Sequence, residues 1–484
     1  AREPIDVLHE AKGALLSTSF SGDFHRLEER FFRLYQQDVS ARDTPRPEAR
    51  RLLEEALLCL PIYRLPPVSE DSPPQGPVLH VLAQTLQKAR AHCGMTDSAL
   101  PEFLYGLLRG PPATEEARAF AIGFAQLSAP LMAKGYEDCA LYRWPMLMST
   151  AEVGSAPGVF ASSPSQVHHR LAARVHWPYS LLATSTHDTK QSEDVRARLH
   201  VLSEIPAAWR AWCRGHFFTD MWRSVAPMVD NKVRYQLLQT LVGAWPIDEG
   251  RAQRHMQKAV REAREHTSWS APHLQYERAV VELVGTVYNN AELREAIAAW
   301  VDKLAPHAQR NALAELLLKL TAPGVPDIFQ GTELWHPRLV DPDNRSDVDF
   351  RVRRAYLRRC RMFSAPEVMK QASVGLPKMW LIHRVLSFRR DHGPLFGPGA
   401  DYSPLPTEGP RADQLFAFAR GGGAMVIAVP RLWCASPPDD NQTTLRLPRG
   451  RYRNILDNGA ECNDNVSLSW LFRHFPVALL WRCP

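Results

Sequence analysis

The chain of 484 residues is long enough for about three domains, and its 45% hydrophobic and 23% charged residues are ordinary for a folded globular protein. Its formal net charge of +6 is small for this length, so the charge favours solubility and indicates no particular binding partner. No apolar run approaches the ~20 residues that a helix needs to span a bilayer, so the sequence predicts no membrane-spanning helix.

Eight cysteines lie scattered between Cys59 and Cys483, with neither a C-x-x-C pair nor a His/Cys ligand spacing. We therefore predict reduced thiols in a cytoplasmic protein, with no metal and no disulfide framework. His168 and His169 are adjacent and cannot share a helix face as zinc ligands would. The first residues, AREP, hold no apolar signal core and no initiating methionine, so we expect the sequence to begin after a cleavage or inside a longer gene product.

Apolar residues recur at helical spacing in the first part of the chain and again within 207–319. We expect both parts to be helical, with the apolar stripes buried as core and no ligand needed to explain them. The stripes are Leu27, Phe31, Leu34 and Tyr35; Leu53, Ala56, Leu57 and Leu60; and Leu313, Leu316, Leu317 and Leu320.

Two short apolar runs, 179–184 and 325–329, read as buried strands. The first runs into the polar cluster 185–189. The second is bracketed by Gly324 and Gly331 and is followed by Glu333. Active sites of (β/α) barrels are built at the carboxyl ends of their strands. Both runs are therefore placed to deliver polar groups to such a site.

The last part of the chain has the pattern of an antiparallel β domain, with short strands separated by turn signals. The runs 415–419 and 425–429 flank three glycines at 421–423 and predict a hairpin. Further strands are expected at 445–447, 466–470 and 477–481.

The richest polar stretch is 184–198, in which His187 stands beside Asp188 at the end of the first strand. Such a pair suits an enzyme that grips sugars, because imidazole donates to a hydroxyl and a fixed carboxylate stabilises an oxocarbenium-like transition state. His-Asp pairs are common, however, and a helix N-cap formed by Asp188 or Thr189 is the default alternative.

The stretch THDTKQSEDVRAR at 186–198 is very similar to the signature of the maltooligosyl trehalose synthases, α-glucan-rearranging enzymes of the α-amylase clan. Further stretches resemble the same family in the same order, and the chain resembles the carboxyl-terminal two thirds of these enzymes. They are 130–138 with 142–143, 235–245, 258–269, and 323–335 with 339–345.

This resemblance implies an α/β fold: a partial (β/α)8 barrel of the α-amylase type with large helical insertions and a C-terminal antiparallel β domain. The implied domains are a mainly helical insertion at 1–125, a barrel segment at 126–200, a helical insertion at 201–315, the last barrel strand and helix at 316–370, and the β domain at 371–484.

The resemblance also assigns roles residue by residue. Asp188 would be the third carboxylate of the family, which stabilises the transition state, and His187 would hydrogen-bond the same sugar. Eight further residues are expected to contact or support sugar, with a structural salt bridge or cap as an equal alternative for each. They are Lys134, Glu137, Asp138, Lys190, Gln330, Glu333, Asp343 and Arg345. Trp269 and Trp335 would stack on glucose or be buried core.

The implied reaction is an intramolecular transfer on a maltooligosaccharide. A carboxylic acid protonates the last α-1,4 linkage, a carboxylate nucleophile traps the remaining chain, and the retained glucose attacks through its anomeric hydroxyl to leave an α,α-1,1 bond. No cofactor is required. Neither the family's G-x-R-x-D stretch with its nucleophile nor the following glutamate, the general acid, is found in the sequence. We therefore expect this chain alone to be inactive, with an N-terminal barrel segment as its partner.

Three interpretations follow: the second piece of a split enzyme, a fragment of a longer polypeptide, or a decayed non-catalytic relative that binds glucan or serves as a scaffold. Gln191 and the pair Ser346-Asp347 depart from the family pattern. His187, Asp188, Lys190, Glu193 and Asp194 are all present, which favours a piece of an active enzyme.

Nucleic-acid binding by the arginines of 351–361 is a third functional hypothesis. The alternative is a solvated helix face with Val352, Ala355 and Tyr356 packed beneath it. We expect neither nucleic acid nor membrane as a partner.

Overall fold

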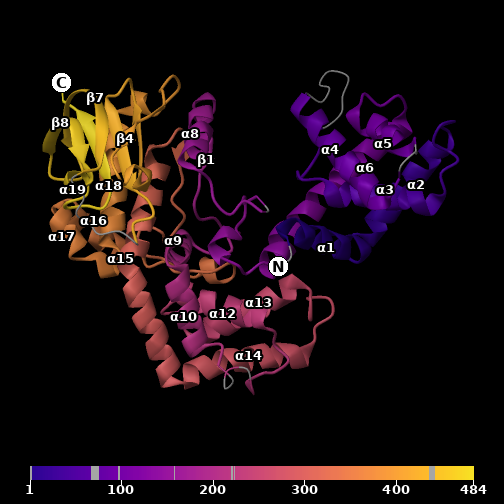
Figure 1. Ribbon diagram of the computed structural model, residues 1–484, viewed down its shortest axis with the longest axis horizontal. Coiled ribbons are helices and arrows are strands. Elements are labelled where there is room, and N and C mark those ends of the chain that lie inside the picture. Colours follow the sequence, from indigo (N-terminus) through magenta and orange to yellow (C-terminus); the bar gives the residue numbers. More distant parts are fainter. Residues whose placement is uncertain are drawn as a thin grey trace. The chain divides into compact units, whose positions relative to one another are not determined.

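Helices dominate the structure, a computed structural model that describes residues 3–66, 76–95, 99–156, 158–219, 222, 224–434 and 442–483 (Figure 1). The chain divides into two units that are described separately. Unit 1 comprises Ala1–Trp144, Ala156–Gly158 and Val260–Ala271, and unit 2 comprises Pro145–Ser155, Val159–Ala259 and Pro272–Pro484. The five-domain division from the sequence is a different, finer one and stays a prediction.

Unit 1 is a helical assembly around a large apolar core, with a second, smaller apolar cluster beside it. The predicted stripes supply that core: Phe31, Leu53 and Ala56 are fully buried, and Leu34 packs against them partly buried. The helices are α1 (Pro4–Ser17), α2 (Ser21–Gln36), α3 (Arg46–Cys59), α4 (Gly76–Cys93), α5 (Leu100–Arg109), α6 (Glu115–Met132) and α7 (Leu141–Arg143).

Helix α6 continues into a π-helical segment, η1 (Ala133–Ala140), which packs against α1. Gly135 is required at that contact, because a Cβ there would meet Lys12 Cγ at 2.5 Å. The buried Lys12 ammonium donates to the carbonyl oxygens of Leu58 (2.9 Å) and Leu60 (3.1 Å) at the end of α3. Burial lowers the pKa of Lys12 to about 8. Wide π-helical turns often occur at functional sites, and η1 carries three of the predicted site residues.

Unit 2 contains the other helices that lie within the described residues. The long helix α15 presents the predicted leucine stripe, all four residues of which are buried against α9 and α18. The helices are α8 (Pro164–Ala173), α9 (Glu193–Glu204), α10 (Pro206–His216), α12 (Asn231–Ala244), α13 (Glu249–Ala263, whose end belongs to unit 1), α14 (Leu274–Asn289), α15 (Ala291–Thr321), α16 (Phe350–Cys360), α17 (Ala365–Met369), α18 (Leu376–Asp391) and α19 (Leu468–Leu471), with short turns η2 (Met148–Thr150), η3 (Arg174–His176), η4 (Asp343–Arg345), η5 (Ala372–Val374), η6 (Gly393–Leu395) and η7 (Ala412–Gln414).

The last part of unit 2 is an antiparallel sheet, as the sequence predicts (Figure 1). The predicted hairpin is β5–β6, in which Leu415 pairs with Pro430 and Arg420 with Met425. Phe416 and Phe418 face the core that contains α15 and α18, while Leu415 and Ala417 face a second core on the other side of the sheet. The strands are β3 (Ser403–Pro404), β4 (Thr407–Glu408), β5 (Leu415–Arg420), β6 (Met425–Pro430), β7 (Thr444–Asn454), β8 (Ala460–Ser467) and β9 (Ala478–Arg482), in the order β3-β5-β6-β9-β7-β4 with β8 on β7.

One strand prediction in this domain is partly wrong. The run 466–470 is a strand only up to Ser467, and Leu468–Leu471 forms helix α19. Ser467 is the N-cap of that helix and accepts a hydrogen bond from the backbone N–H of Trp470. The N-cap at this serine favours a helix over the strand that the alternating pattern predicts.

The two short runs read as strands pair with each other in parallel, as β1 (Leu181–Leu182) and β2 (Val325–Pro326). The prediction that they are buried is wrong, because Leu181 is 70% exposed and Val325 is 38% exposed. The pair forms a two-stranded sheet, so one neighbour cannot bury apolar side chains that a wider sheet with helices on its faces would cover.

Helix α16 carries the arginine run, yet the predicted packing of its apolar face is wrong. Val352 and Ala355 are exposed, and Tyr356 is half-buried. Arg353 faces inward instead, because its guanidinium pairs with the carboxylate of Glu333 at 2.9 Å.

All eight cysteines are free of disulfide bonds. Within the described residues, no helix is both long enough and apolar enough to cross a bilayer.

Candidate active site

Two loops of unit 2 meet at the carboxyl ends of β1 and β2. Because the two strands are parallel, the segments that follow them leave at the same edge, as expected for a barrel-type site. Backbone hydrogen bonds join the loops: Val340 N–H donates to Lys190 O (3.0 Å) and Ser192 N–H donates to Arg338 O (2.9 Å). The side-chain amide of Asn344 donates to His187 O at 2.9 Å. The loop with the His-Asp pair is therefore braced by the loop after β2.

His187 is exposed and the side chain of Asp188 is 42% exposed, so both can reach a bound molecule. The Lys190 ammonium, almost fully buried, lies 3.6 Å from Asp188 Oδ1. The N-cap alternative for Asp188 or Thr189 is wrong, because the N-cap of α9 is Ser192, whose hydroxyl accepts from Val195 N–H. Thr189 instead donates through its hydroxyl to Thr186 O at 3.0 Å.

The buried carboxylate of Glu152 fixes the backbone just after Asp188. It accepts hydrogen bonds from the N–H groups of Lys190 (2.7 Å) and Gln191 (3.0 Å), and it pairs with Arg196 at 3.2 Å. It also accepts from the N–H of Val153 at 2.8 Å, and a carboxylate with four donors holds this turn rigidly. Glu152 was not predicted, since no spacing relates it to the 186–198 stretch.

A buried charged network lies at the start of α9. The Lys378 ammonium is 2.7 Å from Glu193 Oε1 and 2.9 Å from Asp194 Oδ1, and Lys319 Nζ is 3.3 Å from Glu193 Oε2. Burial alone would raise the pKa of the Glu193 carboxyl. The two ammonium groups outweigh this effect and hold that pKa well below its ordinary value. Lys319 and Lys378 were not predicted either. They lie on α15 and α18, and their only sequence signal is a lysine within an apolar helical stretch.

The loop after β2 holds Gln330 and Glu333. Gln330 is exposed at the surface of the turn. Glu333 accepts from Gly331 N–H at 3.0 Å and pairs with Arg353 Nε at 2.9 Å. These contacts favour a supporting role for Glu333, the alternative that the sequence left open. Trp335 also has a structural contact, donating through its indole N–H to Ala372 O at 2.6 Å.

Asp343 is likewise engaged by the protein. Arg251 reaches it with two guanidinium nitrogens, at 2.6 Å and 2.8 Å, and Leu339 N–H donates to it at 2.8 Å. Burial alone would raise the pKa of Asp343. The hydrogen bonds from Arg251 and Leu339 outweigh this effect and hold that pKa below its ordinary value. Asp343 therefore shapes the loop, whereas Arg345 is exposed and lies 3.7 Å from Asp341.

A cavity of about 340 Å³ adjoins this loop, lined by charged side chains that include Arg251, Lys258 and Asp343, together with His255. His255 is buried, and within the described part of the chain its Nε2 has no hydrogen-bond partner. Burial lowers the pKa of His255 to about 4.

His255 is expected to make the protein sensitive to acid. Its folded pKa lies below the ordinary 6.5, so the unfolded chain binds the proton more tightly. The stability it contributes is complete above pH 6.5 and is lost as pH falls from 6.5 towards about 4. Over that pH interval the free energy of unfolding should decrease less in His255→Gln than in the parent protein. The difference between the two decreases should reach roughly 3 kcal/mol. Denaturant midpoints measured across the interval give the slope, with exposed His169→Gln as control. Identical slopes for His255→Gln and the parent would contradict this account.

Three predicted residues lie in unit 1, on η1. Lys134 pairs with Asp138 at 2.5 Å, and Glu137 accepts a hydrogen bond from the hydroxyl of Tyr63. The wider turn of η1 brings these polar groups onto one short segment. Trp269, in the same unit, is half-exposed and lies against Arg261, whose guanidinium carbon is 4.7 Å from the ring centroid. Core burial is therefore wrong for this tryptophan.

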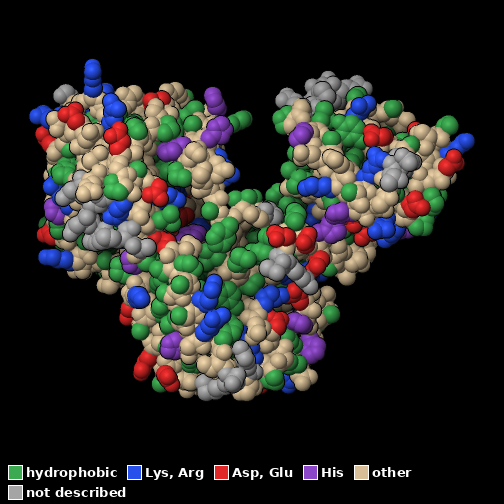
Figure 2. All heavy atoms as spheres, in the orientation of Figure 1, with side chains coloured by type: hydrophobic (Ala, Val, Ile, Leu, Met, Phe, Trp, Pro, Cys, Tyr) green, Lys and Arg blue, Asp and Glu red, His purple; other side chains and the backbone are tan. Residues whose placement is uncertain are grey.

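Unit 2 has a second, more apolar cavity of about 940 Å³ between α9, α10 and α12. Its lining includes Trp209, Tyr235 and Phe160. Trp209 stacks on Trp212, and its indole N–H donates to the Tyr235 hydroxyl at 2.9 Å. Figure 2 shows hydrophobic side chains gathered over this part of unit 2.

No protein-family model matches the chain. Two proteins from Mycobacterium tuberculosis, strains CDC 1551 and H37Rv, each named "Putative maltooligosyl trehalose synthase", are 36% identical to it over 397 residues. The match covers 80% of this chain and 49% of each relative, so the chain spans about half the length of the curated relatives it matches.

Solved structures agree. Two structures of maltooligosyltrehalose synthase from Arthrobacter ramosus, a mutant and a second form, match with TM-scores of 0.83 and 0.82 at 30% identity. Each match covers 100% of this chain and 59% of the other. The family predicted from the sequence motifs is confirmed, and partial coverage agrees with resemblance to one part of these enzymes.

Proposed function

Because this chain belongs to the family of the maltooligosyl trehalose synthases, about half of whose length it spans, we propose that it forms part of an enzyme that rearranges maltooligosaccharides. The proposed reaction converts the α-1,4 linkage at the reducing end into an α,α-1,1 linkage, giving maltooligosyl trehalose. The observation that carries the proposal is the half-exposed Asp188 beside His187, on a loop braced at the carboxyl ends of two parallel strands.

In this proposal Asp188 stabilises positive charge on the sugar at the cleaved bond. Its carboxylate is held in place by the rigid turn that Glu152 fixes and by nearby Lys190, so little reorganisation is needed as charge develops. His187 donates a hydrogen bond to a hydroxyl of the same sugar. The glucose released by cleavage must stay in place and water must stay out, which requires a closed cavity around these groups.

A retaining transfer also needs a nucleophile and a general acid. By the family resemblance both lie on strands that precede β1, and we propose that a segment outside the given sequence supplies them. The exposure of Leu181 and Val325 at the paired strands supports this, and so do the exposed rings of Trp177 and Tyr179 nearby. A further strand with its own apolar side chains would cover this edge.

The test is a chimera in which the amino-terminal segment of the Arthrobacter ramosus relative precedes this chain. With maltopentaose we expect loss of the reducing-end signal without matching release of glucose, and a non-reducing product in chromatography. The chain by itself should give no turnover. A chimera that melts cooperatively and binds maltopentaose, yet leaves the reducing ends unchanged, would count against the proposal.

A non-catalytic glucan-binding protein is the second candidate function. The cavity lined by Trp209, Tyr235 and Phe160 favours it, because large aromatic faces in a concave site suit a sugar ring. Calorimetry would then show maltooligosaccharide binding to the chain by itself, weakened by Trp209→Ala, with no turnover in the chimera.

A further inference from the structure

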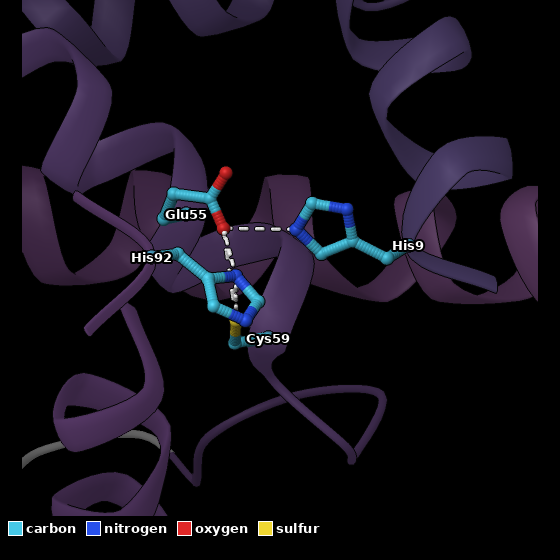
Figure 3. A group of neighbouring side chains, drawn as sticks. All are labelled: His9, Glu55, Cys59 and His92. Carbon is cyan, nitrogen blue, oxygen red and sulfur yellow. Dashed lines mark hydrogen bonds and ion pairs between the residues drawn. The ribbon is translucent and has the colours of Figure 1, made fainter. Parts of the chain in front are cut away.

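Four side chains with metal-ligating atoms converge in unit 1, apart from the site described above (Figure 3). His9 lies on α1, Glu55 and Cys59 lie one turn apart on α3, and His92 lies in the last turn of α4. Residues spaced by four share one face of a helix. Three helices thus bring these groups to one point, and a short sequence spacing connects only Glu55 and Cys59.

The ligand atoms form a tight cluster. Glu55 Oε2 is 2.8 Å from His9 Nε2 and 2.8 Å from His92 Nδ1. Cys59 Sγ is 3.8 Å from Glu55 Oε2 and 3.7 Å from His92 Nδ1. All four atoms lie within 4.8 Å of one another. In Figure 3 one carboxylate oxygen of Glu55 faces both imidazole rings, and the sulfur of Cys59 lies next to the His92 ring.

These separations suit a tetrahedral transition-metal ion. Zinc bonds of about 2.0–2.3 Å place neighbouring ligand atoms roughly 3.3–3.6 Å apart in a tetrahedral site with one sulfur. The two sulfur distances, 3.7 Å and 3.8 Å, lie close to that range, and the two imidazole–carboxylate distances need to open by less than about 1 Å. Imidazole and thiolate ligands favour Zn²⁺ over Ca²⁺ or Mg²⁺, which prefer oxygen.

We propose that His9, Glu55, Cys59 and His92 form a structural zinc site that joins α1, α3 and α4. With thiolate and carboxylate as ligands, the two negative charges balance the ion, and the thiol proton passes to solvent on binding. Four protein ligands leave no open position for a substrate, which is the pattern of structural sites. Nothing in this site enters the glucan chemistry proposed above.

The surroundings agree with a site that an ion can enter. The His92 side chain is 51% exposed, whereas Glu55 is 15% exposed, so a cation approaches past His92 to a carboxylate set deeper in the unit. Lys12 holds the end of α3 through the carbonyls of Leu58 and Leu60, which flank Cys59 in sequence. The helix end that carries the sulfur is therefore fixed before any ion binds.

The alternative is a hydrogen-bonded cluster in which Glu55 accepts from both imidazoles and no ion binds. Metal binding by the full chain separates the two. We expect one equivalent of Zn²⁺ to remain after dialysis, as measured by plasma mass spectrometry, and Co²⁺ to give intense visible bands and a thiolate-to-cobalt charge-transfer band. Zinc should also raise the melting midpoint, and Ca²⁺ and Mg²⁺ should not.

Cys59→Ser is the decisive variant, because it keeps the shape of the side chain and removes the sulfur. We expect it to abolish the charge-transfer band and to weaken zinc binding by at least about tenfold. Cys93→Ser, next to His92, and His80→Ala, exposed on the same helix, are matched controls that should bind as the parent does. No retained zinc, or an unchanged cobalt spectrum in Cys59→Ser, would overturn the proposal.

Discussion

Replacing Asp188 by Asn in the active chimera is expected to lower the rate of maltopentaose conversion by roughly 10²–10³-fold. The amide keeps the size of the side chain, but one accepting oxygen becomes an NH2 donor and no charge remains to stabilise a cationic sugar. Asp188 projects from a turn that Glu152 and Asn344 hold through backbone groups, so the substitution should leave the fold intact. We expect kcat to fall strongly and KM to change little, because the missing charge acts mainly in the transition state.

Asp347→Asn is the matched control, because Asp347 is exposed and lies on the neighbouring loop. It removes the same charge from the same part of the surface and should leave the rate unchanged. Equal rates for the parent and Asp188→Asn would remove Asp188 from the chemistry and contradict the role proposed for it.

Lys378→Met is expected to lower the free energy of unfolding by roughly 3–5 kcal/mol. Lys378 is fully buried and its ammonium faces both Glu193 and Asp194 at the start of α9. Methionine fills a similar volume but leaves Asp194 without this cation and Glu193 with Lys319 alone. Breaking a buried ion pair from one side is costly because the remaining charge keeps its desolvation penalty. Denaturant unfolding of the full chain measures the loss.

A second variant separates charge from packing. Adding Asp194→Asn to Lys378→Met removes the stranded carboxylate and should recover part of the loss, whereas a pure packing defect would only add to it. Lys370→Met, at an exposed position, is the control for the change of residue type. A stability of Lys378→Met equal to that of the control would show that this network contributes little.

Local pattern was sufficient for much of the fold. The leucine stripe on α15 and the hairpin β5–β6 could be predicted because helical and alternating spacings bury one face of each element. The same reasoning placed β1 and β2 but predicted the wrong burial. An apolar run implies a covered strand, and here Leu181 has one neighbouring strand and remains open to solvent.

The site was predictable only where its groups lie in one motif. His187 and Asp188 stand together in the sequence. Glu152 reaches the backbone after Asp188 from a separate element, and Lys319 and Lys378 reach the start of α9 from two others. The cluster of His9, Glu55, Cys59 and His92 was missed for the same reason, because ligand spacing within one segment is the usual signal for a metal and these four come from three helices. Contacts between distant segments become visible only in the folded chain.

The pairing of β1 with β2 has a consequence for the order of folding. Leu181 meets Val325 only after the chain has made the whole excursion through α9–α15, so this contact closes a very long loop. Helices form from neighbours in sequence and assemble quickly, whereas strands joined over such separations are slow to meet. The loop that presents His187 and Asp188 is thus among the last features to acquire its native geometry, and a nascent chain that has not yet reached β2 has no such edge.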